Sequence, residues 1–459
     1  MYNPARIALA GIGVWLFFWL ITPVYATATL APTAIFYVAC CYIGFFLGCG
    51  AYTLTSGVPD AAVPVSDWRA PQLSRLFWIS LAIGLAGMGL RLYDRVVLRG
   101  ADYATNAVDF RESLTQTTAG PVSAVAAVLF PFCFIPLITL LAARFRPRQI
   151  PLYIIAGIAF VLPTIESFAQ LSRSVLLTTA VLGFGAITCT KFRGNPANGK
   201  LVAASVAVAI VMSMVSTDIF SNRLDLEERR LSESVITSVY ADHLQPTEEA
   251  WRGLVSGSAL QSRYYSVILP NGMYYISGAY EFSTLWTRPD RQSFSYGAYN
   301  AIAVVRLLQI VFSPDSEPLN EAELVYRPGA FQTFFGNAWV DFGYFGPLFL
   351  FVMGYFANVL GRGARSGKLN LLPLYLYMTV IIFFMPVASF INGGLGNYVI
   401  ASFTLVAIFG PRGNAQPARL APARGRFHAA PQGSPDGAAA LRKPAGDAGP
   451  SEAPARPRI

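Results

Sequence analysis

Ten apolar runs constrain this chain most, because most of them are about as long as a bilayer is thick. A helix needs about 20 apolar residues to cross the hydrocarbon core of a membrane. The runs lie at about 7–25, 29–54, 76–90, 120–143, 150–169, 174–190, 201–219, 343–360, 371–390 and 397–410. Hydrophobic residues make up 54% of the 459 residues and charged residues only 13%, whereas soluble domains carry about 25% charge. The sequence therefore predicts an all-α polytopic membrane protein with about ten transmembrane helices, and it excludes a soluble enzyme.

Basic residues predict how these helices are oriented. If the N-terminus is inside and the helices alternate, all the lysines and an excess of basic over acidic residues fall on the inner side. A positive inner side is the rule for such proteins, so both termini are expected to be cytoplasmic. The net charge of +9 is then a topology signal, because the sequence lacks the basic groove with interleaved aromatic residues that marks a nucleic-acid binder.

The pattern divides the chain into four parts. They are 1–219 with helices 1–7, 220–335 as a large outer loop with short amphipathic helices, 336–410 with helices 8–10, and 411–459 as a disordered cytoplasmic tail. The tail has almost no large apolar residue, so it cannot bury a core. The first run also resembles a cleavable signal peptide, but a retained first helix is expected in a polytopic chain.

Charged residues follow the third run, on the side where basic residues are not expected. Arg91, Asp94 and Arg95 are followed by Arg99 and later by Arg111. Arg91 and Arg95 are four residues apart and share a helix face, which suits a clamp for the oxygens of a diphosphate. Alternatively, Asp94 pairs with Arg91 in a self-compensating ion pair at the helix end. Arg91, Asp94, Arg95 and Arg111 are therefore candidate substrate-binding residues.

Arg173 lies in a minimal outer turn between the fifth and sixth runs, where topology favours no basic residue. We take it as a candidate catalytic residue that binds an anionic leaving group. Glu166 precedes it by one to two helical turns and is a candidate substrate-binding residue. The alternatives are that Glu166 only pairs with Arg173, or that Arg173 snorkels to the membrane surface.

The segment from Arg327 to Pro347 leads from the predicted outer loop into the eighth helix. Asp341 is expected at the outer membrane edge, where it either orients an acceptor hydroxyl or stabilises a helix terminus. Arg327 and Asp341 are therefore candidate catalytic residues. His243, the one histidine expected outside, is either a general base or a solvated loop residue.

The sequence offers no site for a metal or a cofactor. The five cysteines all lie in apolar runs, and only two histidines are present. A phosphate-cradling P-loop is also absent, so ATP-driven transport by this chain alone is not expected. We predict that the protein works without a metal and without a cofactor.

Four features carry a resemblance. They are Leu90 to Asp102 with its arginines, Leu171-Ser172-Arg173-Ser174, the long outer loop, and Thr333 to Gly346 with Asp341-Phe342-Gly343. Together they span most of the chain, and they resemble the bacterial oligosaccharide repeat-unit polymerases, the O-antigen polymerase (Wzy-type) family. In that family, outer-face arginines engage the lipid diphosphate donor, a role that the resemblance gives to Arg173 and also to Arg91, Arg95 and Arg327.

The resemblance implies a glycosyltransferase at the outer face of the bacterial inner membrane. Its donor and acceptor are polyprenyl-diphosphate-linked oligosaccharides, and the charge that develops on the leaving diphosphate needs arginines. Membrane lipids, a chain-length regulator and a flippase are the implied partners. Related ligases often carry a histidine near the final glycine-rich stretch, where this chain has Asn337, which favours a polymerase. The alternatives are a flippase of lipid-linked glycans, an outer-face ligase and a non-catalytic partner of a polysaccharide-export complex.

Overall fold

The computed structural model describes most of the chain, and what it describes is mainly helix. The described residues are 3–56, 71–101, 120–143, 147–168, 173–191, 239–288, 294–312, 332–392 and 395–411, with the single residues 207, 211, 214, 215, 217, 218, 235, 324, 325 and 327. The chain divides into two units, Met1–Gln416 and Pro417–Ile459, and all described residues belong to the first. Three parts of the prediction lie outside the described residues. They are Arg111, most of the seventh apolar run, and the tail beyond Pro411.

Among the described residues, six helical stretches are long and apolar enough to cross a membrane. They are α1 (Pro4–Ile21), α2 (Pro32–Ser56), α3 with the turn η1 (Pro71–Leu98), α5 to α6 (Pro121–Ala142), α7 (Ile150–Phe168) and α15 to α16 (Thr333–Arg365). Shorter apolar helices of the same part of the chain are α8 (Arg173–Lys191), α17 (Leu372–Phe384) and α18 (Gly396–Phe409). The components of the composite stretches are α3 (Pro71–Tyr93), η1 (Asp94–Leu98), α5 (Pro121–Leu129), η2 (Phe130–Phe134), α6 (Ile135–Ala142), α15 (Thr333–Phe342), η5 (Gly343–Phe345) and α16 (Gly346–Arg365).

Many large apolar side chains on these helices are exposed, which is unfavourable in water. Leu20, Phe36 and Ile158, on α1, α2 and α7, are examples of such exposed side chains. A lipid environment accepts these groups, whereas water penalises apolar surface in proportion to its area. The prediction of a mainly helical chain with apolar helices long enough to cross a membrane is therefore confirmed, while the count of ten helices stays a prediction.

Two of the long stretches are interrupted. The α5–α6 stretch contains the 3₁₀ turn η2, which includes Pro131, and proline cannot donate to the helical ladder. The α15–α16 stretch is broken at Gly343, which has a φ of 54° that favours glycine. The stretch therefore consists of two helices, α15 and α16, joined by the turn η5.

Small residues let two pairs of segments approach closely. A Cβ atom added to Gly48 of α2 would lie 2.0 Å from the carbonyl oxygen of Phe351 on α16. A Cβ atom added to Gly87 of α3 would lie 2.4 Å from the backbone nitrogen of Phe130 in η2. Membrane helices use small residues for such backbone contacts. The second contact places the end of α3 against η2, where the candidate residues gather.

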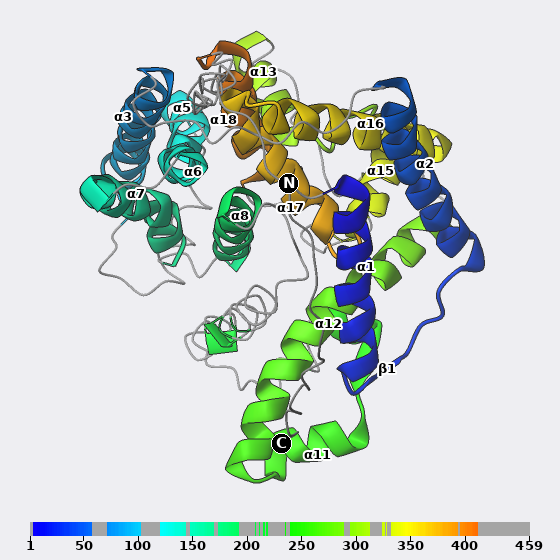
Figure 1. The fold of residues 1–459 in the computed structure, drawn as a ribbon. Coiled ribbons are helices and arrows are strands. Elements are labelled where there is room, and N and C mark those ends of the chain that lie inside the picture. The colour runs from blue at the N-terminus through cyan, green and yellow to red at the C-terminus, as the bar shows by residue number, and fades with distance from the viewer. Residues whose placement is uncertain are drawn as a thin grey trace, which may run out of the picture. The chain divides into compact units, whose positions relative to one another are not determined.

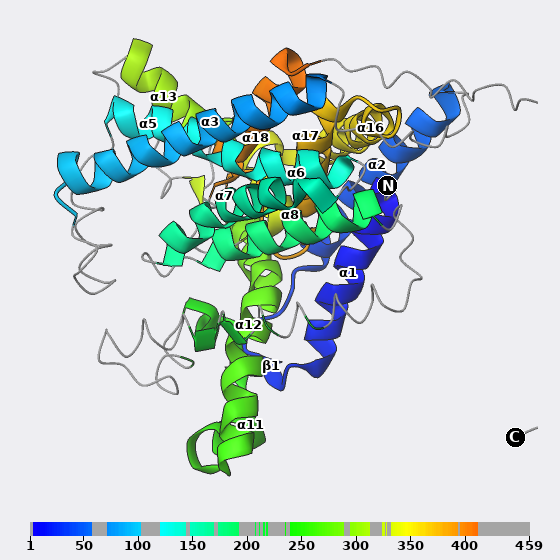
Figure 2. The ribbon, with the colours of Figure 1, turned by 60° about the vertical axis from the view of Figure 1, so that its left-hand side comes forward.

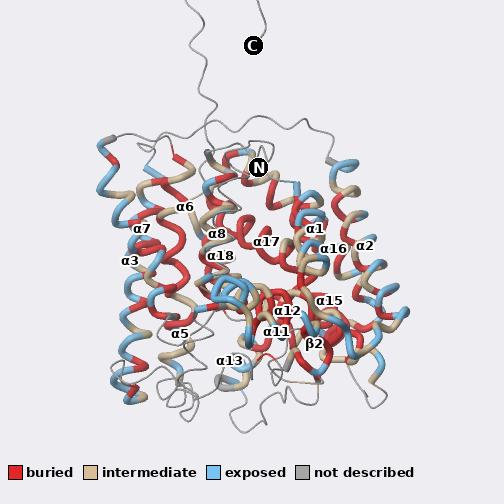
Figure 3. The backbone as a smooth tube through the Cα atoms, turned by 90° about the horizontal axis from the view of Figure 1, so that it is seen from below, coloured by how far each residue is buried: buried red, intermediate tan, exposed pale blue. Residues whose placement is uncertain are grey.

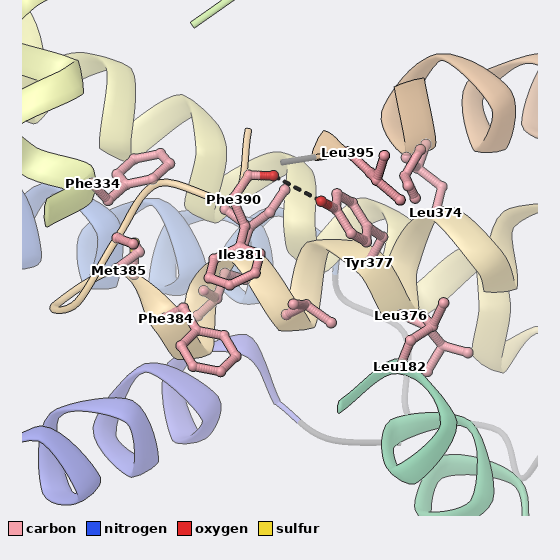
Figure 4. Close-up of a cluster of buried hydrophobic side chains, with 14 of the residues drawn as sticks. Leu182, Phe334, Leu374, Leu376, Tyr377, Ile381, Phe384, Met385, Phe390 and Leu395 are labelled. Carbon is pink, nitrogen blue, oxygen red and sulfur yellow. Dashed lines mark hydrogen bonds between the residues drawn. The ribbon is translucent and has the colours of Figure 1, made fainter. Parts of the chain in front are cut away.

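The helix α17 forms the centre of the packed core. It is buried along nearly its whole length (Figure 3) and packs against α1, α8, α16 and α18. Tyr377 donates a hydrogen bond to the carbonyl oxygen of Phe390 at 2.8 Å, which ties α17 to the segment before α18 (Figure 4). Leu182 of α8 and Phe334 of α15 belong to the same cluster. A helix that is apolar all round is expected to be enclosed in this way.

The region predicted as an outer loop contains a long helix. The helices there are α11 (Glu248–Ser256), α12 (Ala259–Thr287) and α13 (Ile302–Phe312). With 29 residues, α12 contradicts the expectation of only short helices, and it lies beside α1 (Figures 1 and 2). Its tyrosines, tryptophan and small residues pack on α1, on the start of α2 and on the connection between them, where the backbone nitrogen of Ala31 donates to Oγ of Ser283 at 2.8 Å. Tyr275, for example, stacks on Phe18, and Trp286 donates to Thr33. This mixed composition hides the helix in the sequence, because it shows no simple apolar stripe.

Two short strands depart from the all-α prediction. β1 (Val24–Ala26) pairs antiparallel with β2 (Leu244–Pro246), with Tyr25 opposite Gln245. The pair fastens the α1–α2 connection to the segment that carries His243, whose carbonyl oxygen accepts from the backbone of Thr27 at 3.0 Å.

Candidate functional site

Charged side chains gather where the end of α3 meets the end of α7. We call this group the arginine cluster. It consists of Arg91, Asp94, Arg95 and Arg99 from α3 and the residues that follow it, and Glu166 from α7. The helix α3 passes into η1, a π-helical turn that contains Asp94 and Arg95, and both side chains are buried. A π turn changes which residues share a face, and such turns recur at functional sites. The sequence analysis does not predict this turn.

Two arginines of the cluster share one carboxylate. Arg91 donates from Nε to Oε2 of Glu166 at 3.1 Å, and Arg95 pairs with the other carboxylate oxygen. The guanidinium carbon of Arg91 also lies 4.5 Å from the centre of the Phe130 ring, a favourable cation–π contact. Since Glu166 is close to the end of α7, the cluster joins the ends of α3 and α7.

Asp94 has a different partner from the predicted one. Its Oδ2 lies 3.0 Å from Nε of Arg99, and Nη2 of Arg99 donates to Oγ of Ser123 at 2.8 Å. The predicted pair of Asp94 with Arg91 is therefore wrong. The reason is η1, because the backbone nitrogen of Arg99 bonds to the carbonyl oxygen of Asp94 across the π turn.

Arg173 is the first residue of α8, and its side chain lies outside the described residues. Because α7 ends at Phe168 and α8 packs against it, Glu166 and Arg173 belong to the same end of this helix pair. A contact between Glu166 and Arg173 stays a prediction. Among the described residues, Glu166 pairs with Arg91 and Arg95, and neither pair is predicted from the sequence.

A second group, the Glu281 cluster, consists of Asp242, His243, Glu281 and Arg327. Arg327 pairs with both oxygens of Glu281 and with Asp242, and its Nη2 lies 2.9 Å from Nε2 of His243. The same histidine nitrogen is 3.3 Å from Oε1 of Glu281. Glu281 is 1% exposed, which a carboxylate tolerates only when it is paired. The cluster thus joins the segment before β2, the helix α12 and the segment before α15.

Only part of this cluster is predictable from the sequence. The solvated-loop interpretation of His243 is wrong, because the residue is buried and its ring stacks on Tyr280 with ring centres 6.1 Å apart. Burial raises the pKa of the Tyr280 phenol, so that ring stays neutral beside the charged groups. Glu281 is missed altogether. Its only signal is that it is the single acidic residue of the stretch 259–287, which gains meaning once α12 is known.

Asp341 is fully buried and already has four donors. Its oxygens accept from Oγ of Ser295 at 2.6 Å, from the backbone nitrogens of Tyr299 and Asn300 at 2.9 Å each, and from the Asn300 amide at 2.6 Å. These bonds hold the turn before α13, in which Tyr296 has a φ of 50°. Asp341 stands near the C-terminal end of α15, so it does not complement the dipole of its own helix. The geometry favours a structural role over the orientation of an acceptor hydroxyl.

An amide network surrounds this carboxylate. Asn337 donates to Oδ1 of Asn392 at 2.7 Å and to Oδ1 of Asn300 at 3.4 Å. Asn397 donates to the carbonyl oxygens of Asn300 at 3.1 Å and Ile391 at 3.0 Å. The network links α15, the turn before α13 and the start of α18. Asn337, which stands where a ligase would be expected to carry histidine, is therefore engaged in packing.

These observations define a class of protein, a mainly helical protein with apolar helices long enough to cross a membrane and with charged groups buried near helix ends. Among the residues that the structure describes, no three His, Cys, Asp or Glu side chains are grouped so as to hold a metal ion. Comparisons with family models, with curated proteins and with solved structures give no match for this chain. Its function is therefore argued from its own residues.

Proposed function

We propose that this protein is a polysaccharide polymerase of the outer face of the bacterial inner membrane, with about ten transmembrane helices and both termini cytoplasmic. It joins repeat units that are carried on polyprenyl diphosphate. The bond from the anomeric carbon to the diphosphate breaks as the hydroxyl oxygen of a second lipid-linked repeat bonds to that carbon. The proposal rests on the resemblance described above and on the arginine cluster.

The observation that carries the proposal is the gathering of Arg91, Arg95 and Glu166 at one helix end, with Arg173 at the start of the next helix. Two guanidinium groups and a carboxylate gather there among the described residues, and guanidinium groups are the side chains best suited to bind an anion. A diphosphate suits this group because guanidinium forks match phosphate oxygens, and a partly buried site strengthens the attraction. The same charges stabilise the diphosphate as it leaves.

A flippase is the less favoured alternative. A transporter of charged lipids usually carries ionisable groups near the middle of the bilayer, along the path of its substrate. In the described apolar helices, charged residues occur near the ends, as Arg75, Arg91, Glu166 and Arg362 illustrate. A substrate path through the middle of these helices has no such support.

An outer-face ligase is the second candidate, and one observation favours it. His243 lies against Arg327, which precedes the glycine-rich stretch, so the structure does bring a histidine to that neighbourhood. A ligase would use the same diphosphate donor and differ in its acceptor. Both hypotheses, polymerase and ligase, therefore use the arginine cluster for the donor and differ in the product that is formed.

Deletion of the gene separates these functions. A polymerase deletion leaves single repeat units transferred to the final acceptor, without long chains on a glycan gel. A ligase deletion leaves long chains on the lipid carrier, and a flippase deletion leaves single repeats on the cytoplasmic side. Long chains on the final acceptor in the deletion strain would refute the polymerase.

A further inference from the structure

Gln332 is a buried side chain whose amide has no hydrogen-bond partner. It is 3% exposed, and neither Oε1 nor Nε2 is bonded to any part of the chain that the structure describes. It occupies the N-cap position of α15 without capping that helix through its side chain. A buried amide that lacks partners loses its hydrogen bonds to water without replacement, so such groups call for an explanation.

The amide lies over the first turn of α15 and next to α12. A Cβ atom added to Gly336 would lie 3.6 Å from Oε1 of Gln332 and 3.4 Å from the ring of Phe282. Phe282 belongs to α12, so the Gln332 side chain stands beside that helix. Ser277, one turn before Glu281 on the same face of α12, is likewise buried with an unpartnered hydroxyl.

The backbone at this point is held in an unfavourable conformation. Thr333, which follows Gln332, has a φ of 62°, a region that a β-branched residue rarely enters. The bond from the Phe334 nitrogen to the carbonyl oxygen of Met385, at 3.0 Å, fixes the chain immediately afterwards. The surrounding structure therefore keeps the Gln332 amide buried where it has no partner of its own.

The chemistry of the missing partner follows from the amide. A carboxamide offers two N–H donors and a carbonyl acceptor, which matches a hydroxyl group that both donates and accepts. It carries no charge, so it does not select the diphosphate. A sugar ring presents such hydroxyls on adjacent carbons.

We propose that Gln332 binds a ring hydroxyl of the acceptor sugar and so helps to set which glycan is extended. The assignment rests on the proposed polymerase function and deepens it. The donor diphosphate belongs to the arginine cluster, whereas the acceptor lies against α12 and the first turn of α15. Binding of the acceptor supplies the hydrogen bonds that the buried amide lacks.

The test uses the full-length protein in detergent. Single lipid-linked repeat units from the deletion strain serve as donor, and the glycan released from them by mild acid serves as a soluble acceptor. Gln332→Met keeps the side-chain length and removes both polar atoms. The half-saturating acceptor concentration should rise roughly 10- to 100-fold, because a site built for hydrogen bonds discriminates strongly. The half-saturating donor concentration should stay unchanged.

The control is Gln245→Met, the same exchange at a glutamine whose amide donates to the Ala241 carbonyl oxygen at 2.7 Å. It should leave both concentrations unchanged. An acceptor dependence of Gln332→Met equal to that of the wild type, or a change in the donor alone, overturns the assignment. If Gln332→Met does not accumulate in the membrane, Gln332→Asn keeps the amide but withdraws it by one carbon, and the same criterion applies. Long chains on the final acceptor in the deletion strain would instead overturn the polymerase, and this assignment with it.

Discussion

The arginine cluster and the Glu281 cluster both bury charged side chains, yet they are balanced in opposite ways. The described residues of the first are three arginines and two carboxylates, with Arg91 and Arg95 both at Glu166 and Arg99 at Asp94. In the second, the single arginine Arg327 faces Glu281, Asp242 and a histidine. The first group suits a bound anion, whereas the second satisfies its own arginine and fastens three segments together. The comparison teaches that buried charge by itself does not mark a binding site, and that the balance of the charges does.

The largest effect is expected where the second cluster is broken. Glu281→Ala leaves Arg327 without its buried partner and should cost about 3–5 kcal/mol of stability, because removal of one member of a buried pair leaves an uncompensated charge. Thermal unfolding of the detergent-solubilised protein measures this loss. Glu248→Ala is the control, since the side chains of Glu248 and Arg252 are exposed and such pairs contribute about 0–1 kcal/mol. An equally small effect of both exchanges would show that the Glu281 cluster does not hold the segments.

The next effect concerns catalysis and tests the first cluster. Arg173→Ala should lower the rate of chain extension by about 10²–10³-fold at a normal protein level, because the diphosphate loses a charged donor as it leaves. Arg173→Lys should restore little, since an ammonium group lacks the bidentate fork. A glycan gel and an immunoblot of the membrane fraction give the two readouts. Arg263→Ala, at an exposed pair with Asp218, should leave the ladder unchanged.

If Arg173 only pairs with Glu166, the outcome differs. Arg173→Ala would then lower the protein level, and Glu166→Gln would do the same damage. A normal ladder from a well-expressed Arg173→Ala protein removes this residue from the site and leaves Arg91 and Arg95 as the donor-binding residues.

The residues of a cluster can be predicted from the sequence when their signal is local, and not when they are recognised only through partners far away along the chain. Arg91 and Arg95 stand out because they follow an apolar run on the side where basic residues are not expected, and that signal is local. Their partner Glu166 is recognised only as a neighbour of Arg173, since pairing across helices depends on packing at Gly87 and on the π turn. Glu281 has no comparable signal, because its partners are far away in the sequence and its helix lacks a simple apolar stripe.

The apolar helices show the same difference between features with a local signal, which are predictable, and features that depend on distant contacts, which are not. The apolar runs predict where long helices lie, since the bilayer imposes a length on each. They do not predict the break at Gly343 or the strand pair β1–β2, because each depends on a contact with a distant segment. Phe294, for example, would collide with a side chain at position 343, at 2.3 Å from an added Cβ atom.

A smaller effect is expected where helices meet at glycine, away from both clusters. Gly48→Ala would place a Cβ atom 2.0 Å from the carbonyl oxygen of Phe351, so α2 and α16 must separate. We expect a loss of about 1–3 kcal/mol in unfolding experiments, as is typical of overpacking. Gly50→Ala is the control on the same helix, because nothing lies within 4 Å of its added Cβ atom. Equal stability of the two variants would contradict the close contact between α2 and α16.

The smallest effect is expected at Ser295, and it tests whether Asp341 has a structural or a catalytic role. Ser295→Ala removes one of the four donors to this carboxylate, and the bond is 2.6 Å long. The loss should be about 1 kcal/mol of stability, the usual contribution of one hydrogen bond, with an unchanged glycan ladder. Ser366→Ala, at an exposed serine that donates to the Gly363 carbonyl oxygen, should change neither quantity. If Asp341 instead orients an acceptor hydroxyl, the loss of Ser295 changes the acceptor dependence of chain extension while the melting temperature stays the same. If Asp341 only holds the turn before α13, Ser295→Ala lowers the melting temperature and leaves the acceptor dependence unchanged. The three remaining donors then keep the carboxylate in place, and it does not contact the acceptor.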